Sequence, residues 1–76
     1  GKHHIRVNCI GPGGFNPGLS DDPERKSFVD TYIANCPLGC WANEDDIKGP
    51  IVFLASEAAN YVTGATIVMD GGWTIW

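Results

Sequence analysis

A short apolar stretch that runs directly into a proline- and glycine-rich loop constrains this chain most. Residues 5–10 alternate in character and are followed at once by Gly-Pro-Gly-Gly. The alternation predicts a strand over residues 5–10, with odd- and even-numbered side chains on opposite faces. Pro12 fixes its own φ and lacks an N–H, whereas Gly13 and Gly14 allow a bound group to approach the backbone closely. Because ligands of open α/β sheets lie beyond the carboxyl ends of strands, the loop indicates a ligand rim, with an ordinary strand-end turn as the alternative.

Two helices are predicted between this strand and the end of the chain. Asp22 is a suitable N-cap for a helix over residues 23–35, in which apolar residues recur at helical spacing. Asn43 is the corresponding N-cap for a second helix over residues 44–58. Pro50 lies inside that second helix and removes one of its hydrogen bonds, so we expect a kink there.

Residues 66–69 are almost entirely apolar and predict the last strand. Strand, helix, helix and strand in this order favour a parallel pair, and therefore an α/β fold. A single helix layer covers one face of such a pair, so the other face and the inner edge of the first strand are expected to be bare. The 76 residues are thus expected to form part of one domain rather than a complete sheet.

The composition excludes several classes of function. A net charge of −4 argues against nucleic-acid and anionic-membrane surfaces, and no apolar run approaches the roughly 20 residues of a membrane span. Cys9, Cys36 and Cys40 lack paired spacing. They are expected to be free thiols in a reducing cytoplasm, and neither they nor the two histidines form a zinc-ligand pattern. No metal site is therefore predicted.

Four short motifs together resemble the C-terminal portion of the short-chain dehydrogenase/reductase family. They lie at residues 5–14, 37–39, 53–56 and 60–73, in family order, and the resemblance covers residues 5–73. The Asp-Gly-Gly-Trp ending is similar to that of sugar-acid and sugar-alcohol dehydrogenases and of 3-oxoacyl-carrier-protein reductases. The resemblance implies the last two strands of a doubly wound Rossmann sheet, binding of NAD or NADP, and hydride transfer to or from a small carbonyl or alcohol substrate.

The resemblance also assigns candidate site residues. The loop after the first strand lies next to the nicotinamide in this family, and the segment from Asn16 to Cys40 corresponds to its substrate lid. The implied cofactor-binding residues are Pro12, Gly13, Gly14 and Phe15. The implied lid residues are Asn16, Leu19 and Trp41.

The chain contains no candidate catalytic residue. The family uses a Tyr with a Lys four positions on, but Tyr32 is followed at that spacing by Cys36, and Tyr61 by Ala65. Residues 1–76 are therefore expected to be a partial Rossmann domain, inactive alone, from a cytoplasmic homo-oligomeric enzyme. The alternative is a stand-alone oligomerisation or interaction module without catalytic activity.

Overall fold

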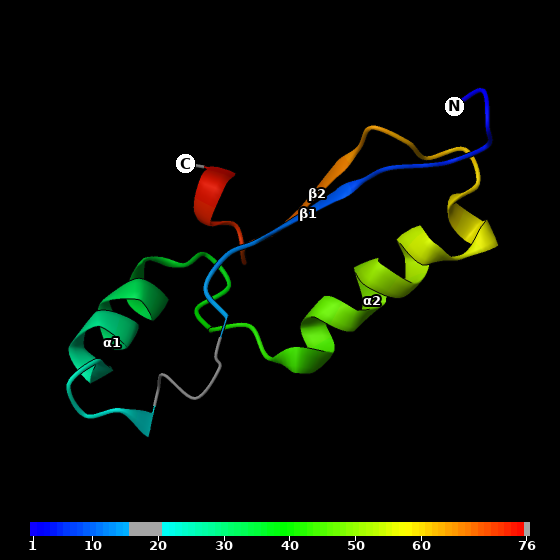
Figure 1. Cartoon of the computed structure of the whole chain (residues 1–76). Coiled ribbons are helices and arrows are strands. Elements are labelled where there is room, and N and C mark those ends of the chain that lie inside the picture. The colour runs from blue at the N-terminus through cyan, green and yellow to red at the C-terminus, as the bar shows by residue number, and fades with distance from the viewer. Residues whose placement is uncertain (16–20, 76) are drawn as a thin grey trace.

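Two short strands form a parallel sheet at the centre of the molecule (Figure 1). The structure is a computed structural model and describes residues 1–15 and 21–75. Strand β1 (Cys9–Pro12) pairs with β2 (Thr66–Met69), so that Cys9 lies opposite Thr66 and Pro12 opposite Met69. The predicted parallel pairing and the predicted bounds of the last strand are confirmed.

The first strand begins later than predicted. The prediction of a strand over residues 5–10 is wrong at both ends, because the ladder with β2 spans only Cys9–Pro12. The preceding residues are held by one backbone hydrogen bond, from the Gly64 N–H to the Val7 carbonyl oxygen at 2.8 Å, and by side chains. The Arg6 guanidinium donates to the Leu54 carbonyl oxygen at 2.9 Å, and the Asn8 amide donates to that of Val62 at 3.0 Å. The expected alternation is present, with Arg6 and Asn8 half-buried and the intervening apolar residues exposed.

Helix α1 (Lys26–Asn35) starts three residues after the predicted position. The Asp22 carboxylate accepts the Glu24 N–H at 3.0 Å, and the Asp22 carbonyl oxygen accepts the Arg25 N–H at 3.0 Å. Asp22 therefore closes a separate turn before the helix, a local alternative that aspartate side chains favour.

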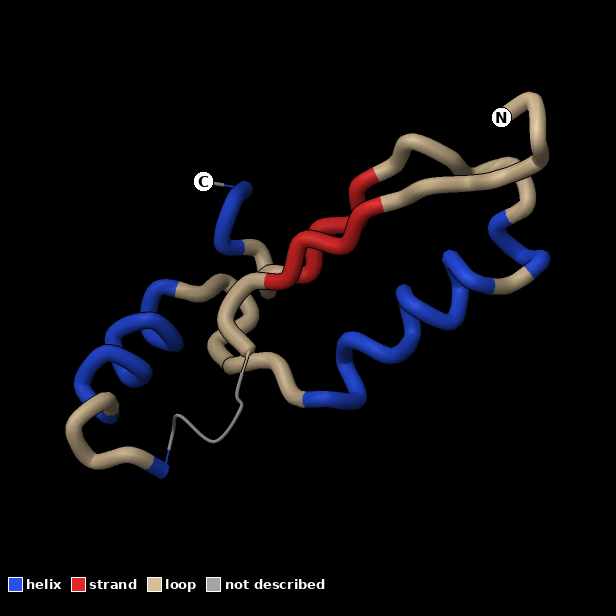
Figure 2. Tube along the Cα trace, viewed as in Figure 1, coloured by secondary structure: helices blue, strands red, loops and turns tan. Residues whose placement is uncertain are grey.

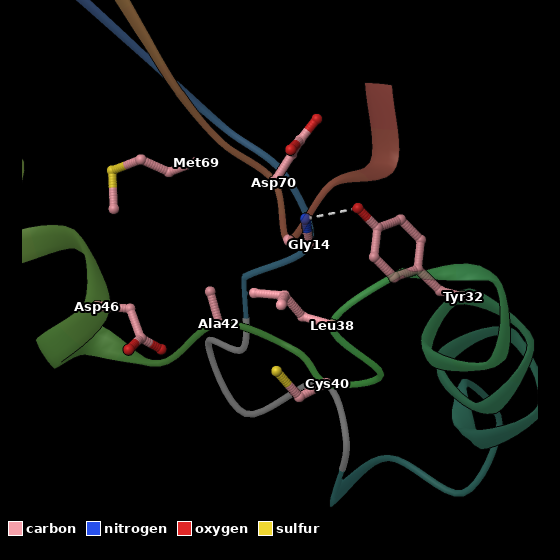
Figure 3. Close-up of a pocket in the computed structure, with 9 residues that line it drawn as sticks. Gly14, Tyr32, Leu38, Cys40, Ala42, Asp46, Met69 and Asp70 are labelled. Atoms are coloured by element: carbon pink, nitrogen blue, oxygen red, sulfur yellow. Dashed lines mark hydrogen bonds between the residues drawn. The ribbon is translucent and has the colours of Figure 1, made fainter. Parts of the chain in front are cut away.

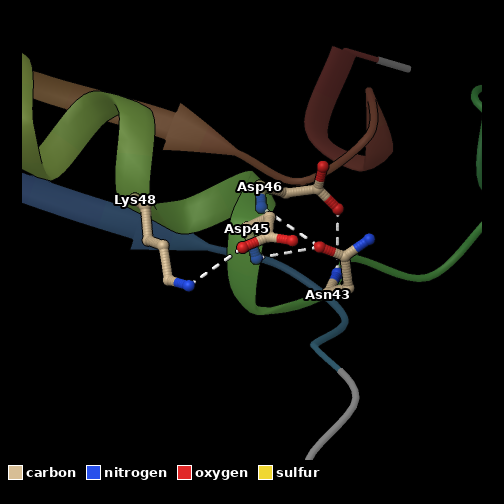
Figure 4. Close-up of polar contacts among 4 residues, drawn as sticks. All are labelled: Asn43, Asp45, Asp46 and Lys48. Carbon is tan, nitrogen blue, oxygen red and sulfur yellow. Dashed lines mark hydrogen bonds and ion pairs between the residues drawn. The ribbon is translucent and has the colours of Figure 1, made fainter.

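Helix α2 (Glu44–Ala55) begins where the sequence predicts, because Asn43 caps it (Figure 4). The Asn43 side-chain oxygen accepts the N–H groups of Asp45 and Asp46, and the Asp46 carboxylate accepts the Asn43 N–H in return. The helix continues through Pro50, as expected. It does not reach residue 58, because Ser56 has an extended conformation (ψ 169°) and a separate short turn, η2 (Glu57–Ala59), follows.

The chain is elongated. Its radius of gyration is 15.4 Å, whereas a compact domain of this length has about 11 Å. Helix α2 runs alongside the sheet, and α1 lies beyond the loop that follows β1 (Figure 2). In the described ranges only Val29, Cys36 and Ala59 are buried apolar residues. None of the described helices has the length and apolar character needed to cross a membrane.

Large apolar side chains remain exposed on both the sheet and the helices. Val7 is 71 % exposed and Val68, on β2, is 54 % exposed. Three consecutive residues of α2, from Ile51 to Phe53, are 49 %, 65 % and 40 % exposed. This agrees with the expectation that the strand pair leaves apolar surface uncovered.

Candidate functional site

The loop that follows β1 contains the four residues predicted to contact a cofactor. It leaves the carboxyl end of β1 as Pro12, Gly13, Gly14 and Phe15. The Gly13 N–H donates to the Met69 carbonyl oxygen at 3.0 Å and extends the ladder by one residue. In a parallel ladder, alternate residues direct their backbone N–H and C=O toward the partner strand. Gly13 is directed toward β2 and Pro12 is not, so the N–H that proline lacks is not needed for a ladder hydrogen bond.

Both backbone polar groups of Gly14 are engaged by other parts of the chain. Its N–H donates to the Tyr32 hydroxyl oxygen at 2.8 Å, and its carbonyl oxygen accepts the Ala42 N–H at 2.9 Å. Phe15 lies opposite Ala42 in a parallel bridge. In such a bridge the backbone N–H and C=O of Phe15 point away from Ala42. Neither group forms a hydrogen bond within the part of the chain that the structure describes.

Four aromatic residues, which we call the aromatic cluster, pack beside this loop: Phe28, Tyr32, Trp41 and Trp73. The Tyr32 ring stacks on Trp73 with centroids 4.3 Å apart and planes 5° apart, and meets Trp41 edge to face at 4.8 Å. Phe28 lies 6.3 Å from both Tyr32 and Trp41. The cluster therefore joins α1, the segment before α2 and the turn after β2.

Asp70 organises the turn after β2. Its carboxylate accepts the Gly72 N–H at 3.0 Å and the Thr74 N–H at 2.8 Å. The Gly71 carbonyl oxygen accepts the Leu38 N–H at 3.0 Å and so ties the turn to the segment after α1. Hydrogen bonding with the Thr74 side chain holds the pKa of Asp70 below its usual value, against the opposing effect of desolvation, and backbone hydrogen bonds from Thr74, Gly72 and Asp70 itself add to the lowering.

The low pKa of Asp70 makes the stability of this turn depend on pH. We expect stability to fall below about pH 4, because the unfolded chain takes up a proton at Asp70 before the folded chain does. The stabilisation is present above the ordinary aspartate pKa and is lost as the pH falls through the lowered folded value. Asp70→Asn should remove this part of the pH dependence, whereas Asp30→Asn, on the exposed side of α1, should retain it.

The measurement is urea unfolding, followed by tryptophan fluorescence at several pH values for the parent and both variants. An Asp70→Asn chain with the same acid dependence as the parent would show that this carboxylate does not stabilise the turn.

A pocket of about 240 Å³ opens beside the loop (Figure 3). Gly14, Tyr32 and Met69 contribute to its wall, together with the carboxylates of Asp46 and Asp70. Both carboxylates accept backbone N–H groups and so cap local turns of the chain. Ligand pockets usually measure about 300–1,000 Å³. This pocket is thus suited to one ring-sized group and is too small for a whole dinucleotide.

The structure brings together some of the predicted site residues. Pro12, Gly13, Gly14 and Phe15 form one continuous loop, but only Gly14 among them lines the pocket. Trp41 belongs to the aromatic cluster, where its indole nitrogen is buried and makes no hydrogen bond within the described residues. The candidate lid residues Asn16 and Leu19 lie outside the described residues.

The sequence did not indicate that Tyr32 and Trp73 stack on each other beside the loop. Tyr32 is one of the apolar positions of the predicted helix over residues 23–35, and the family resemblance implies only that Trp73 lies near a subunit contact or the rim of the substrate pocket, with surface packing as the alternative. One local signal was present: Phe28 precedes Tyr32 by four residues, so the two share a helix face. Nothing local indicates that Trp73, 41 positions later, stacks on that face.

Parallel strands joined by helices, with a glycine loop at the carboxyl end of a strand, define the class of α/β proteins that bind ligands at that sheet edge. A family model described as enoyl-(acyl carrier protein) reductase matches residues 1–74. The chain belongs to this family, within the short-chain dehydrogenases/reductases, and its solved relatives have the Rossmann fold.

Individual relatives are dehydrogenases. The chain is 45 % identical over 73 residues to a 2-dehydro-3-deoxy-D-gluconate 5-dehydrogenase of Pseudoalteromonas atlantica, covering 91 % of this chain and 28 % of the relative. It is 42 % identical over 76 residues to an L-rhamnose-1-dehydrogenase of Scheffersomyces stipitis, covering 95 % and 28 %. A gluconate 5-dehydrogenase from Burkholderia cenocepacia, solved in complex with NADP and tartrate, matches with a TM-score of 0.79 and 37 % identity, covering 95 % and 29 %. The chain thus spans less than a third of the length of each.

Proposed function

We propose that this chain is the C-terminal part of an NAD(P)-dependent short-chain dehydrogenase/reductase that transfers hydride between the cofactor and a carbonyl or secondary alcohol. The observation that carries the proposal is the backbone of the loop after β1. Gly14 is bound on both sides by protein, while the N–H and C=O of Phe15 face away from those contacts. An adjacent donor and acceptor match the carboxamide of a nicotinamide ring.

The loop residues Pro12, Gly13, Gly14 and Phe15 form the proposed nicotinamide-side contact. An added Cβ at Gly13 would lie 2.7 Å from the Asp70 Cα, so the loop follows the turn after β2 closely. When bound, NAD or NADP would accept or donate the hydride. The residues of this chain hold and orient the ring, and we propose no catalytic acid or base among them.

The proposed substrate is a sugar, a sugar acid or a related polyhydroxylated compound. This follows the relatives, which are named for gluconate derivatives and for rhamnose. Trp41, with Asn16 and Leu19, is the proposed substrate lid, and the parent enzyme is proposed to be a cytoplasmic homo-oligomer. The exposed apolar residues of the sheet and α2 support self-association.

A chimeric enzyme tests this proposal. This chain replaces the 73 aligned residues of the Pseudoalteromonas relative, and the chimera is assayed for sugar-acid-dependent formation of reduced dinucleotide. We expect turnover and saturable dinucleotide binding, with the unaltered host as the control. A folded chimera that binds no dinucleotide would contradict the proposal.

The second candidate, a stand-alone oligomerisation module, is favoured by the same exposed apolar surface. Analytical ultracentrifugation of the 76-residue chain, with near-ultraviolet circular dichroism on the same sample, separates the two. A discrete oligomer with ordered aromatic residues, combined with a chimera that lacks dinucleotide binding, would support the module.

A further inference from the structure

The hydrogen bond between Gly14 and Tyr32 connects the loop after β1 to helix α1. Tyr32 is half-buried in α1, and its hydroxyl oxygen accepts the Gly14 N–H at 2.8 Å (Figure 3). Tyr32 lies 18 positions after Gly14 along the chain. A side-chain hydroxyl of α1 thus holds one peptide group of the proposed cofactor loop.

Tyr32 is itself held in place. Its ring stacks on Trp73 and meets Trp41 edge to face, so its hydroxyl has little freedom to move relative to the loop. The Tyr32 ring also packs closely against the loop, since an added Cβ at Gly14 would lie 2.8 Å from the Tyr32 Cζ. The Tyr32 ring and the Gly14 backbone therefore pack without space between them.

We infer that Tyr32 is a positioning residue for the cofactor loop. The inference rests on the proposed function. With its N–H bound to Tyr32 and its carbonyl oxygen bound to the Ala42 N–H, Gly14 has its flanking peptide planes fixed. The second of these planes, between Gly14 and Phe15, also contains the Phe15 N–H and so sets its direction, opposite to the Gly14 carbonyl. Tyr32 acts through Gly14.

The first test measures the hydrogen bond directly in the full 76-residue chain. Amide hydrogen exchange by NMR should show a protected Gly14 amide in the parent. In Tyr32→Phe, which keeps the ring, that amide should exchange roughly five- to tenfold faster, as expected for loss of one hydrogen bond. The Gly13 amide, bound to the Met69 carbonyl oxygen, should be unchanged.

Tyr61→Phe is the matched control, because Tyr61 is fully exposed. It should leave the exchange of both amides as in the parent. A parent chain in which Gly14 exchanges at the random-coil rate would overturn the inference, as would a Tyr32→Phe chain with unchanged Gly14 protection.

The second test uses the chimeric dehydrogenase and separates positioning from stability. Tyr32→Phe should raise KM for the dinucleotide about fivefold with kcat within about twofold. If Tyr32 only stabilised the fold, Tyr32→Phe would reduce the fraction of active enzyme, and with it the apparent kcat, but would leave KM unchanged. That result would overturn the inference. An inactive parent chimera would count against the proposed function alone, because the exchange measurement still decides whether Tyr32 fixes Gly14.

Discussion

Replacing Gly14 with alanine is expected to lower the free energy of unfolding by about 1–3 kcal/mol, the usual cost of forcing a methyl group into occupied space. The added Cβ would lie 2.8 Å from the Tyr32 Cζ and closer still to Cε1. Tyr32 cannot retreat without leaving its stack on Trp73. The same change should weaken dinucleotide binding by the chimera, because the loop and the aromatic cluster must separate.

Gly49→Ala is the matched control for that experiment. Gly49 lies inside α2, and apart from its chain neighbours and the backbone of its own helix nothing lies within 4 Å of its added Cβ. The higher helix propensity of alanine, up to about 1 kcal/mol, is opposed there by contact of the added methyl group with the ring of Pro50. Urea unfolding followed by tryptophan fluorescence should therefore show a larger loss of stability for Gly14→Ala than for Gly49→Ala. Equal stability of the Gly14→Ala chain and the parent would show that the loop does not pack against Tyr32 as described.

Gly71→Ala is expected to cost about 3 kcal/mol, from two effects that act together. Gly71 has φ of +62°, a left-handed conformation that non-glycine residues rarely adopt. Its added Cβ would also lie 2.6 Å from the buried Cys36 sulfur. Disturbing this position breaks the contact between the turn after β2 and Leu38, whose N–H donates to the Gly71 carbonyl oxygen.

Gly64→Ala separates the two effects. Gly64 has φ of +70°, but nothing lies within 4 Å of its added Cβ. This variant should lose only the conformational part, about 1–2 kcal/mol. Equilibrium unfolding measures the free energy of unfolding that each variant loses. The loss for Gly71→Ala minus the loss for Gly64→Ala gives the cost of crowding at Gly71. If both lose the same amount, the Cys36 contact adds nothing to the cost.

The features predicted correctly from the sequence depend on residues that are close together along the chain. Asn43 caps α2 because the N–H groups it binds lie two and three residues away. The bounds of β2 follow from a short apolar run, and the alternation over residues 5–10 follows from strand geometry. Pro12 and the glycines after it predict a loop, because their backbone preferences are intrinsic.

The features predicted wrongly depend on partners elsewhere. The limits of β1 are set by the four residues of β2 that pair with it. Residues before the ladder are held by side chains that reach the end of α2, as Arg6 does at Leu54. The end of α2 falls at Ser56, whose extended conformation no local pattern announced. Pairing and burial decide these limits, and neither is visible in a local pattern.

The parallel α/β plan follows from the order of the predicted strands and helices, whereas the Pro-Gly loop and the capped start of α2 follow from backbone preferences and hydrogen bonds between near neighbours. The meeting of Tyr32 from α1 and Trp73 from the turn after β2 beside Gly14 depends instead on the tertiary structure. These residues lie 18 and 59 positions from Gly14 along the chain. Stacking and hydrogen bonding act over a few ångströms in space, so such a contact exists only once the chain has folded.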